Sequence, residues 1–593
     1  MAARLPRLER ASFARNVRSV QDLRVALVAL LGIAACSSEP DGAGGGGHRS
    51  KPNTAPPPPA WVDVKGEQLA PLPAHQQATT SRFATHDVCA QCHSAGDTAL
   101  RDEKGRDVSP VGTWKASPMA LAARDPYYLA VVAEELAFRP GLKLTVERTC
   151  TRCHAPEASV ELGAEGIGPS FATLTTGTTP EAHLAREGVA CTGCHQIADS
   201  NLGTLESFSG AFVIEDARLI YGPYKDPRGD FMRTITNYSP TYGAHMSRSA
   251  LCATCHTVIT RPRDAKGNVG PNFPEQTPYL EWAASAYATE GTLGERSAEC
   301  QDCHMPSISD DEVELELAIA KQPDGLPRRK PFRRHGFAGA NVALSRFGAS
   351  DPSWFGANVT KEEHEAQARS AEAMLRRAAT VEAREVRRSG DGIELVVGVA
   401  NQSGHKFPTG YPSRRAFLHV LVTAPDGRVV FESGKTDAYG RLVTSTGALA
   451  EAKTFHPHLD VVDREDLVQI YESVPVDNQG KIAHRPLDAL RYAKDNRLLP
   501  VGFDRRSRFS AYISPVGTDA DPGWGHEDTV TYRIPKAPAA SAIVVELLFQ
   551  VARPSELEAL AVRPTPAARR LFSFADAAPL APVLVARAET RAP

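Results

Sequence analysis

The stretch Cys191-Thr-Gly-Cys194-His195 decides how this sequence is interpreted, because its pattern of two cysteines and a histidine occurs five times. The other copies are Cys89-Ala-Gln-Cys92-His93, Cys150-Thr-Arg-Cys153-His154, Cys252-Ala-Thr-Cys255-His256 and Cys300-Gln-Asp-Cys303-His304. Together they use ten of the eleven cysteines in 593 residues. Positions i, i+3 and i+4 of a helix share one face. Each copy therefore presents two thiols and an imidazole together.

This spacing is the attachment pattern of c-type haem, in which the two thiols bond the porphyrin and the imidazole binds iron. Zinc knuckles and disulfides also use Cys-x-x-Cys pairs, but neither requires a histidine directly after the second cysteine. Histidine makes up only 18 of the 593 residues, so chance does not explain a histidine in all five places. The sequence predicts five covalent haems, bonded through these ten cysteines. The expected proximal iron ligands are His93, His154, His195, His256 and His304.

Each iron has a second axial position, and histidines outside the motifs are the first candidates for it. Those within the motif-bearing region are His86, His183, His245 and His335. The first three closely precede a motif, so we expect each to bind the iron of a neighbouring haem. The fifth position has three candidates: His405 in a turn-rich loop, Met119 through its thioether, or no protein ligand, which leaves an iron open to substrate.

The chain begins with a targeting segment. Six arginines in residues 1–24 precede the apolar run Val25–Ala35, which is too short to span a bilayer but suits a secretory signal. Ile33-Ala34-Ala35-Cys36 resembles the lipobox of bacterial lipoproteins, in which the cysteine is acylated. We expect a signal peptide over 1–35, a lipid on Cys36 and a Gly/Pro-rich tether over 36–81. The alternative is an uncleaved anchor with an incidental cysteine.

Composition narrows the function classes. Hydrophobic residues are 42% and charged residues 23%, which excludes a polytopic membrane protein and a disordered chain. The formal net charge of −3 gives no support to nucleic-acid binding. An exported, lipid-anchored protein facing the periplasm or the cell exterior is predicted, with its only membrane contact through lipid.

The fold class is predicted as α+β. Residues 82–345 are expected to be a mostly helical, loop-rich pentahaem domain whose core is largely porphyrin. Thr360-Lys-Glu-Glu363 is a capping-box match within a linking helix over 346–380, with His364 solvated on its first turn.

From 381 to 593 an antiparallel β-sandwich domain is expected, interrupted by an insertion near 440–525. Alternating strands are predicted over 393–399, 417–422, 429–431, 529–534 and 543–549. We interpret His419 as a sheet histidine, whereas a metal site at His456, His458 and His484 is a weaker hypothesis.

Several longer strings resemble the bacterial multihaem cytochromes c, a superfamily that includes the pentahaem nitrite reductase and hydroxylamine oxidoreductase. They are Trp114–Tyr128, Glu187–Cys191, Gln276–Trp282 and Cys300–Pro306, together with Gly404–Gly410 and Lys494–Phe503 further on. The resemblance implies a lipoprotein form of a multihaem cytochrome. One departure matters: the nitrite reductase attaches its catalytic haem through Cys-x-x-Cys-Lys, which is absent here, so that enzyme's chemistry is not carried over.

Two functions follow from these patterns. The first is electron transfer through five haems between a donor and an acceptor protein, which suits a chain without a recognised catalytic motif. The alternative is an oxidoreductase acting on a small nitrogen or sulfur compound at one open haem. In either case the strand-rich domain is a candidate docking module for a redox partner.

Overall fold

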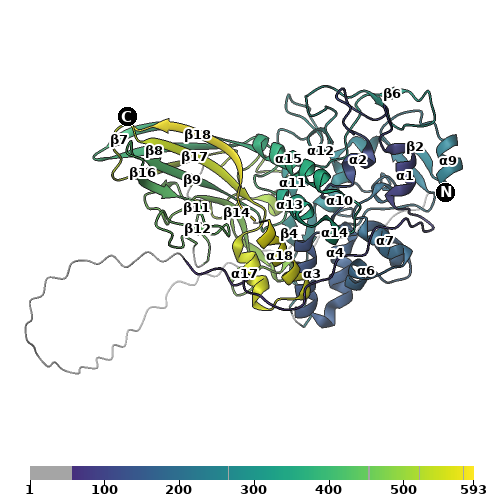
Figure 1. Ribbon diagram of the computed structural model, residues 1–593, viewed down its shortest axis with the longest axis horizontal. Coiled ribbons are helices and arrows are strands. Elements are labelled where there is room, and N and C mark those ends of the chain that lie inside the picture. Colours follow the sequence, from purple (N-terminus) through teal and green to yellow (C-terminus); the bar gives the residue numbers. More distant parts are fainter. Residues whose placement is uncertain (1–55, 265, 452–453, 520, 522, 579) are drawn as a thin grey trace, which may run out of the picture. The chain divides into compact units, whose positions relative to one another are not determined.

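The computed structural model describes residues 56–593, apart from 265, 452–453, 520, 522 and 579. The predicted signal peptide, Cys36 and the first part of the tether lie outside these residues. The described chain contains both helices and strands and is α+β, as expected. In Figure 1 the long strands lie on the left side of the described structure and most short helices lie on the right.

Short helices carry the five Cys-x-x-Cys-His motifs. The helices up to residue 304 are α1 (His86–His93), α2 (Pro110–Trp114), α3 (Pro126–Phe138), α4 (Lys143–His154), α5 (Pro156–Ala164), α6 (Phe171–Thr175), α7 (Pro180–Arg186), α8 (Cys191–Cys194), α9 (Asp230–Thr236), α10 (Ser249–His256), α11 (Pro278–Ala283) and α12 (Cys300–His304). Single-turn η1 (Pro140–Leu142) and η2 (Ala244–Ser247) join them, with short strands β1 (Leu219–Gly222), β2 (Ser239–Tyr242), β3 (Val258–Thr260), β4 (Phe273–Gln276), β5 (Leu317–Ala318) and β6 (Arg328–Arg329). Four of the motif helices end at the motif histidine, and α8 ends one residue earlier.

Local sequence explains where these helices begin. Asp125 accepts a hydrogen bond from the Tyr127 backbone N–H at 2.8 Å, and Pro126 occupies the first helical position of α3. Ser109 and Thr179 cap α2 and α7 in the same way. The polar residue before each proline therefore sets the start of the helix.

The predicted linking helix is present as α15 (Lys361–Ala378), preceded by α13 (Val342–Ser350) and α14 (Pro352–Phe355). Its capping box is confirmed, since Glu363 N–H donates to the Thr360 hydroxyl and Thr360 N–H donates to the Glu363 carboxylate. The prediction that His364 is solvated is wrong. Its side chain is buried against Phe355. Gly348 provides the space for the imidazole, because a Cβ at that position would lie 2.2 Å from it.

Two sheets form the second half of the chain. Their strands are β7 (Ala379–Ser389), β8 (Gly392–Asn401), β9 (Arg415–Thr423), β10 (Val429–Ser433), β13 (Val461–Val462), β14 (Ile470–Val476), β15 (Arg491–Asp495), β16 (Glu527–Ile534), β17 (Ala542–Gln550) and β18 (Val583–Arg591). One sheet has the order β15-β14-β9-β17-β18 with β10 beside β9, and the other has the order β13-β16-β8-β7. All pairs are antiparallel except β13 with β16. The five predicted strands correspond to β8, β9, β10, β16 and β17.

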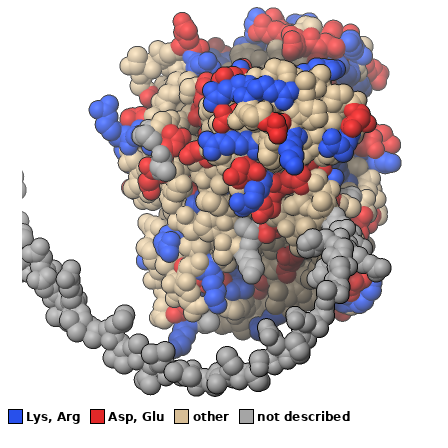
Figure 2. Space-filling model, turned by 90° about the vertical axis from the view of Figure 1, so that its left-hand side faces the viewer, with Lys and Arg blue, Asp and Glu red and all other residues tan. Residues whose placement is uncertain are grey.

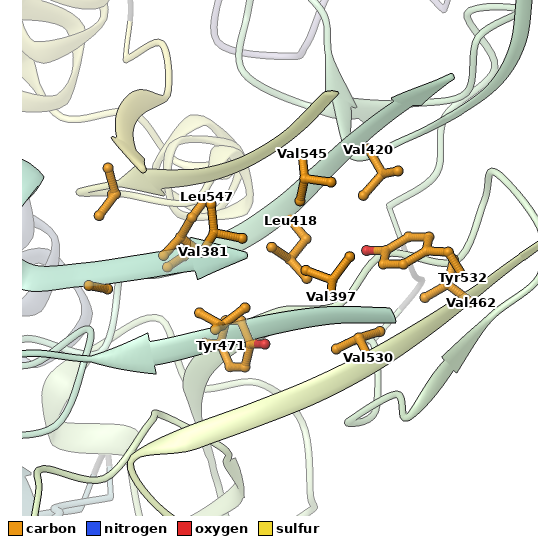
Figure 3. Packing of buried hydrophobic residues seen from close by; sticks show 14 of the residues in the cluster. Val381, Val397, Leu418, Val420, Val462, Tyr471, Val530, Tyr532, Val545 and Leu547 are labelled. Carbon is orange, nitrogen blue, oxygen red and sulfur yellow. The ribbon is translucent and has the colours of Figure 1, made fainter. Parts of the chain in front are cut away.

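The two sheets bury one common hydrophobic cluster (Figure 3). Val397 of β8, Leu418 of β9 and Val545 of β17 are all completely buried in it. Alternate residues of a strand point to the same face, so the period-two pattern of these segments supplies the apolar faces. The region predicted as an insertion holds β13, β14 and β15, η3 (Pro486–Asp488), α16 (Ser510–Ile513) and the two-residue strands β11 (Lys435–Thr436) and β12 (Leu442–Val443) at its edge.

Two parts of the chain depart from the predicted domain plan. Residues 56–81 were expected to be free tether, but Trp61 and Leu72 are buried and Leu69 N–H donates to Pro566 O at 2.8 Å. Trp61 and Leu72 bury their apolar surface in a hydrophobic cluster, and the segment is therefore packed against the rest of the described chain. Within the predicted sandwich, 554–577 forms two helices, α17 (Pro554–Val562) and α18 (Pro566–Ala577). These helices share a hydrophobic cluster with α3.

On the face shown in Figure 2, Lys and Arg are intermingled with Asp and Glu, most densely in the upper half of the view. Among the described residues, no helix combines the length and apolar character that crossing a membrane requires.

Candidate functional site

Four of the five motif histidines are oriented by the same kind of hydrogen bond. Nδ1–H donates to a backbone carbonyl in His93 (Ile319 O, 2.8 Å), His154 (Ala122 O, 2.7 Å), His195 (Tyr221 O, 2.7 Å) and His304 (Ala338 O, 2.7 Å). A carbonyl can only accept, so Nδ1 carries the proton. The lone pair of Nε2 is then free for a metal, which is the usual arrangement of a ligating histidine.

Burial keeps these imidazoles in the form that binds metal. It lowers the pKa of His93, His154, His195 and His304, and it lowers the pKa of His256 to about 4. Burial disfavours the charged imidazolium, so all five rings are neutral at pH 7.

The motif thiols place neighbouring motifs against one another. A hydrogen bond with the Cys89 thiol raises the pKa of Cys191. In the pairs Cys153/Cys255 and Cys252/Cys300 the same kind of contact raises the pKa of the first thiol and lowers that of the second. Burial and then Cys255 raise the pKa of Cys194 to about 12. The motifs therefore follow each other in space in the order one, three, four, five, with motif two beside motif four. No disulfide joins any of the ten described cysteines.

Two motif histidines face a second imidazole. The ring centres of His195 and His335 are 6.3 Å apart with planes inclined by 21°, and those of His304 and His405 are 6.3 Å apart at 17°. A metal–imidazole bond of about 2.0 Å on each side, plus about 1.1 Å from each nitrogen to its ring centre, amounts to about 6.2 Å. The donor sets therefore fit one iron between each pair of rings.

The other candidate distal residues are held by polar neighbours. His86 donates Nδ1–H to Glu187 Oε2 at 2.7 Å, which leaves its Nε2 free. His245 donates Nε2–H to Ile197 O at 2.9 Å, which leaves Nδ1. Nδ1 of His183 lies 3.2 Å from an Arg186 guanidinium nitrogen, and the Met119 carbonyl accepts from Val189 N–H. For these four, iron ligation stays a prediction.

Sequence reasoning missed one histidine beside this group. His75 lies between Asp87, at 2.7 Å, and the second oxygen of Glu187, at 3.0 Å. Burial opposes its charge, but the two carboxylates outweigh it and raise the pKa of His75. His75 lies in the segment predicted to be tether, and the sequence there contains no haem motif. Its role here is to hold Glu187, which in turn orients His86.

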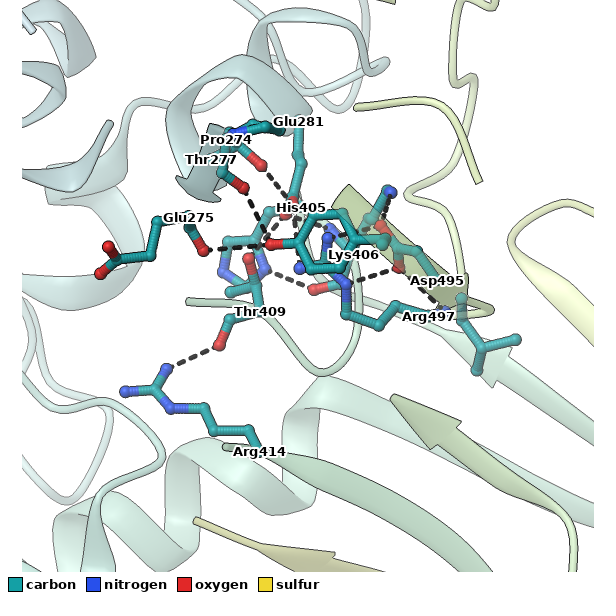
Figure 4. A network of polar contacts seen from close by, with 12 residues as sticks. Pro274, Glu275, Thr277, Glu281, His405, Lys406, Thr409, Arg414, Asp495 and Arg497 are labelled. Atoms are coloured by element: carbon teal, nitrogen blue, oxygen red, sulfur yellow. Dashed lines mark hydrogen bonds and ion pairs between the residues drawn. The ribbon is translucent and has the colours of Figure 1, made fainter. Parts of the chain in front are cut away.

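A buried ionic network holds the chain at Lys406, directly after His405 (Figure 4). Glu281 of α11 accepts from the Lys406 backbone N–H at 3.1 Å and pairs with Arg497 at 3.1 Å. Asp495 pairs with the Lys406 ammonium at 2.7 Å and with Arg497 at 2.7 Å. The two carboxylates balance the two cations. Burial alone would raise the pKa of Glu281, but Arg497 and Lys406 lower it.

The side chain of Asn401 completes this support. Its amide donates to the His405 carbonyl at 2.7 Å and to the carbonyls of Leu498 and Leu499. His405 Nδ1–H donates to Lys406 O at 2.9 Å, so its Nε2 remains available. Glu281 belongs to the motif-bearing half and Lys406, Asp495 and Arg497 to the strand-bearing half. The network therefore joins the two halves where the predicted distal ligand projects.

The hypothesis of a metal site at His456, His458 and His484 finds no common centre among the described residues. His456 bonds Ala450 O and His484 bonds Glu556, whereas His458 lies near Asp521 and Asp528. The amide nitrogen of Gln469 donates to His458 Nδ1 at 2.8 Å, so Nε2 carries the proton and faces the carboxylates. His419 is a sheet histidine bonded to Glu432 and Glu546.

Comparison with known proteins adds one distant likeness. No family model and no curated protein matches the chain. Among solved structures, a penta-heme cytochrome c552 from Thermochromatium tepidum is similar at 18% identity and a TM-score of 0.48, over 86% of this chain and 99% of that one. At that similarity the interpretation of this chain rests on its own motifs and their geometry.

Proposed function

We propose that this protein is a multihaem cytochrome c that holds five covalent haems and passes electrons between redox partner proteins. The observation that carries the proposal is the pairing of a motif imidazole with a second imidazole at 6.3 Å in two separate motifs. The five repeats of the attachment pattern support the same number of haems. When bound, haem iron supplies a one-electron couple.

The chain's own residues prepare these sites in three ways. Backbone carbonyls fix the proton on Nδ1 and turn Nε2 inward, and burial keeps the imidazoles neutral. Contacts between thiols of different motifs bring the attachment points together. Short separations between neighbouring cofactors are what electron hopping through a protein requires. His335 and His405 are assigned as the second ligands of motifs three and five.

The cellular setting belongs to the same proposal. We assign the chain to the lipoprotein form of the multihaem cytochromes, exported and anchored through Cys36, with donor and acceptor proteins as partners. The two sheets that share one core are proposed to be a β-sandwich that docks against the motif region through the Glu281 network.

Three measurements on the purified holoprotein test this function. Pyridine haemochrome absorbance and intact mass are expected to give five haems per chain, and electron paramagnetic resonance is expected to show low-spin iron at motifs three and five. A count of four or fewer with zinc present would contradict the proposal. A high-spin signal in the wild type would instead move the oxidoreductase with one open haem ahead of the electron carrier. The Cys303→Ala variant is the matched control for the haem count, since it removes one thioether from a single motif.

A further inference from the structure

A tyrosine lies flat against the motif histidine of motif two. The rings of Tyr128 and His154 have centres 3.8 Å apart and planes inclined by 4°. Tyr128 is only 9% exposed, and its hydroxyl is buried without a hydrogen-bond partner in the described protein. A buried phenol hydroxyl normally makes a hydrogen bond, so a hydroxyl without one requires an explanation.

One short segment holds His154 in two directions. Ala122 O accepts from His154 Nδ1–H at 2.7 Å, and Tyr128, six residues later, covers one face of the ring. Asp125 lies between them and caps α3, which sets Tyr128 at the third helical position. An imidazole bound through Nε2 keeps one free rotation, about the bond to the metal. The hydrogen bond fixes the ring axis, and the stacked phenol restrains that rotation.

The hydroxyl of Tyr128 is an O–H dipole in a buried position. Because no described protein atom accepts its proton, the dipole is free to turn toward a bound haem. A donor turned toward the haem stabilises the electron-richer, reduced form.

We propose that Tyr128 is a positioning residue for the haem of motif two: its ring sets the orientation of the axial imidazole, and its hydroxyl raises the reduction potential. This inference rests on the proposed haem binding, and it goes further by assigning the stacked ring and the hydroxyl separate effects. Two substitutions separate them. Tyr128→Phe keeps the ring and deletes the hydroxyl, whereas Tyr128→Leu deletes both.

The test uses full-length holoprotein with Tyr127→Phe as the control, because Tyr127 is the adjacent α3 residue and its ring faces Tyr411 instead. Haem count, electron paramagnetic resonance of the oxidised protein and a potentiometric titration are measured for each variant. Tyr128→Phe is expected to leave the g values unchanged and lower one potential among five. Tyr128→Leu is expected to change the g values of one low-spin iron as well. Tyr127→Phe is expected to match the wild type in both measurements.

The outcomes distinguish this inference from the proposed function. Fewer than five haems in the wild type overturn the proposed function itself. Five haems with unchanged potentials in Tyr128→Phe, or unchanged g values in Tyr128→Leu, overturn the corresponding role of Tyr128 alone. If Tyr128→Leu fails to accumulate, Tyr128→Phe still decides the role of the hydroxyl, because it removes a single oxygen from the core.

Discussion

The hydrophobic cluster drawn from both sheets lies mostly in residues 379–593 and also takes in Val342 and three residues of α15, whereas two clusters beside the motifs in residues 82–345 are small. One of the small clusters consists of Trp114, Ala120 and Ala190. The larger cluster around α3 is completed by α18, from the far end of the chain. The strand region thus buries most of its core between its own sheets, and the motif region holds the residues proposed to bind haem. If the proposed haems are bound, their apolar porphyrin surface contributes to the stability of the motif region.

Removing one haem should produce the largest effect and should be confined to the motif region. The double variant Cys191→Ala/Cys194→Ala deletes the attachment of motif three, which lies between motifs one and four in space. We expect four haems instead of five and rapid proteolysis within 82–345, while 379–593 resists digestion. Haem absorbance and limited proteolysis with mass spectrometry check this. Equal digestion of both regions would show that the strand region does not stand on its own core.

A cavity in the strand core should destabilise the strand region and leave the haem count unchanged. Leu418 is completely buried between the sheets, and Leu→Ala changes in such sites cost about 2–5 kcal/mol. Leu418→Ala is expected to lower the free energy of unfolding of the strand region by that amount and leave the haem count at five. Denaturation followed by circular dichroism in the β range checks it. The control is Val429→Ala on β10, 44% exposed, for which about 0.5 kcal/mol or less is expected.

His405 connects the two regions, because it belongs to the strand region and faces the motif histidine His304. His405→Ala is expected to convert one low-spin iron of five to high-spin and to create a site for an added ligand such as imidazole. The other four signals should not change. Electron paramagnetic resonance with and without imidazole measures this. His456→Ala, whose ring bonds a carbonyl instead, is the control, and a response equal to that of His405→Ala would refute the assignment.

The smallest expected effect is a pH dependence confined to the strand region. Burial opposes the charge of His419, but hydrogen bonds with Glu432 and Glu546 raise its pKa above 6.5. A raised folded-state pKa contributes stability that is full below pH 6.5 and is lost as pH rises through the folded pKa. His419→Gln should therefore lower Tm by about 2–4 °C at pH 5.5, equivalent to about 1 kcal/mol, and by less at pH 9. A difference that grows with pH would contradict this.

Local patterns were sufficient for much of the fold. The capping box at Thr360 and the five predicted strands are all present, because each depends on neighbouring residues or on period-two alternation. The packed segment 56–81, the helices α17 and α18 and the burial of His364 were not predicted. The packing of Leu69 depends on Pro566, far away in the chain, and the burial of His364 depends on Gly348, which lies on a different helix.

The sequence by itself determined the chemistry of the candidate sites, because two thiols and an imidazole at i, i+3 and i+4 share a helix face whatever the rest of the chain does. Only the tertiary structure decided which residues meet. His335 faces His195 and His405 faces His304 across 140 and 101 residues, and Tyr128 covers His154 from another helix. Such encounters follow from the path of the whole chain and from buried supports such as Glu281, and no local spacing encodes them.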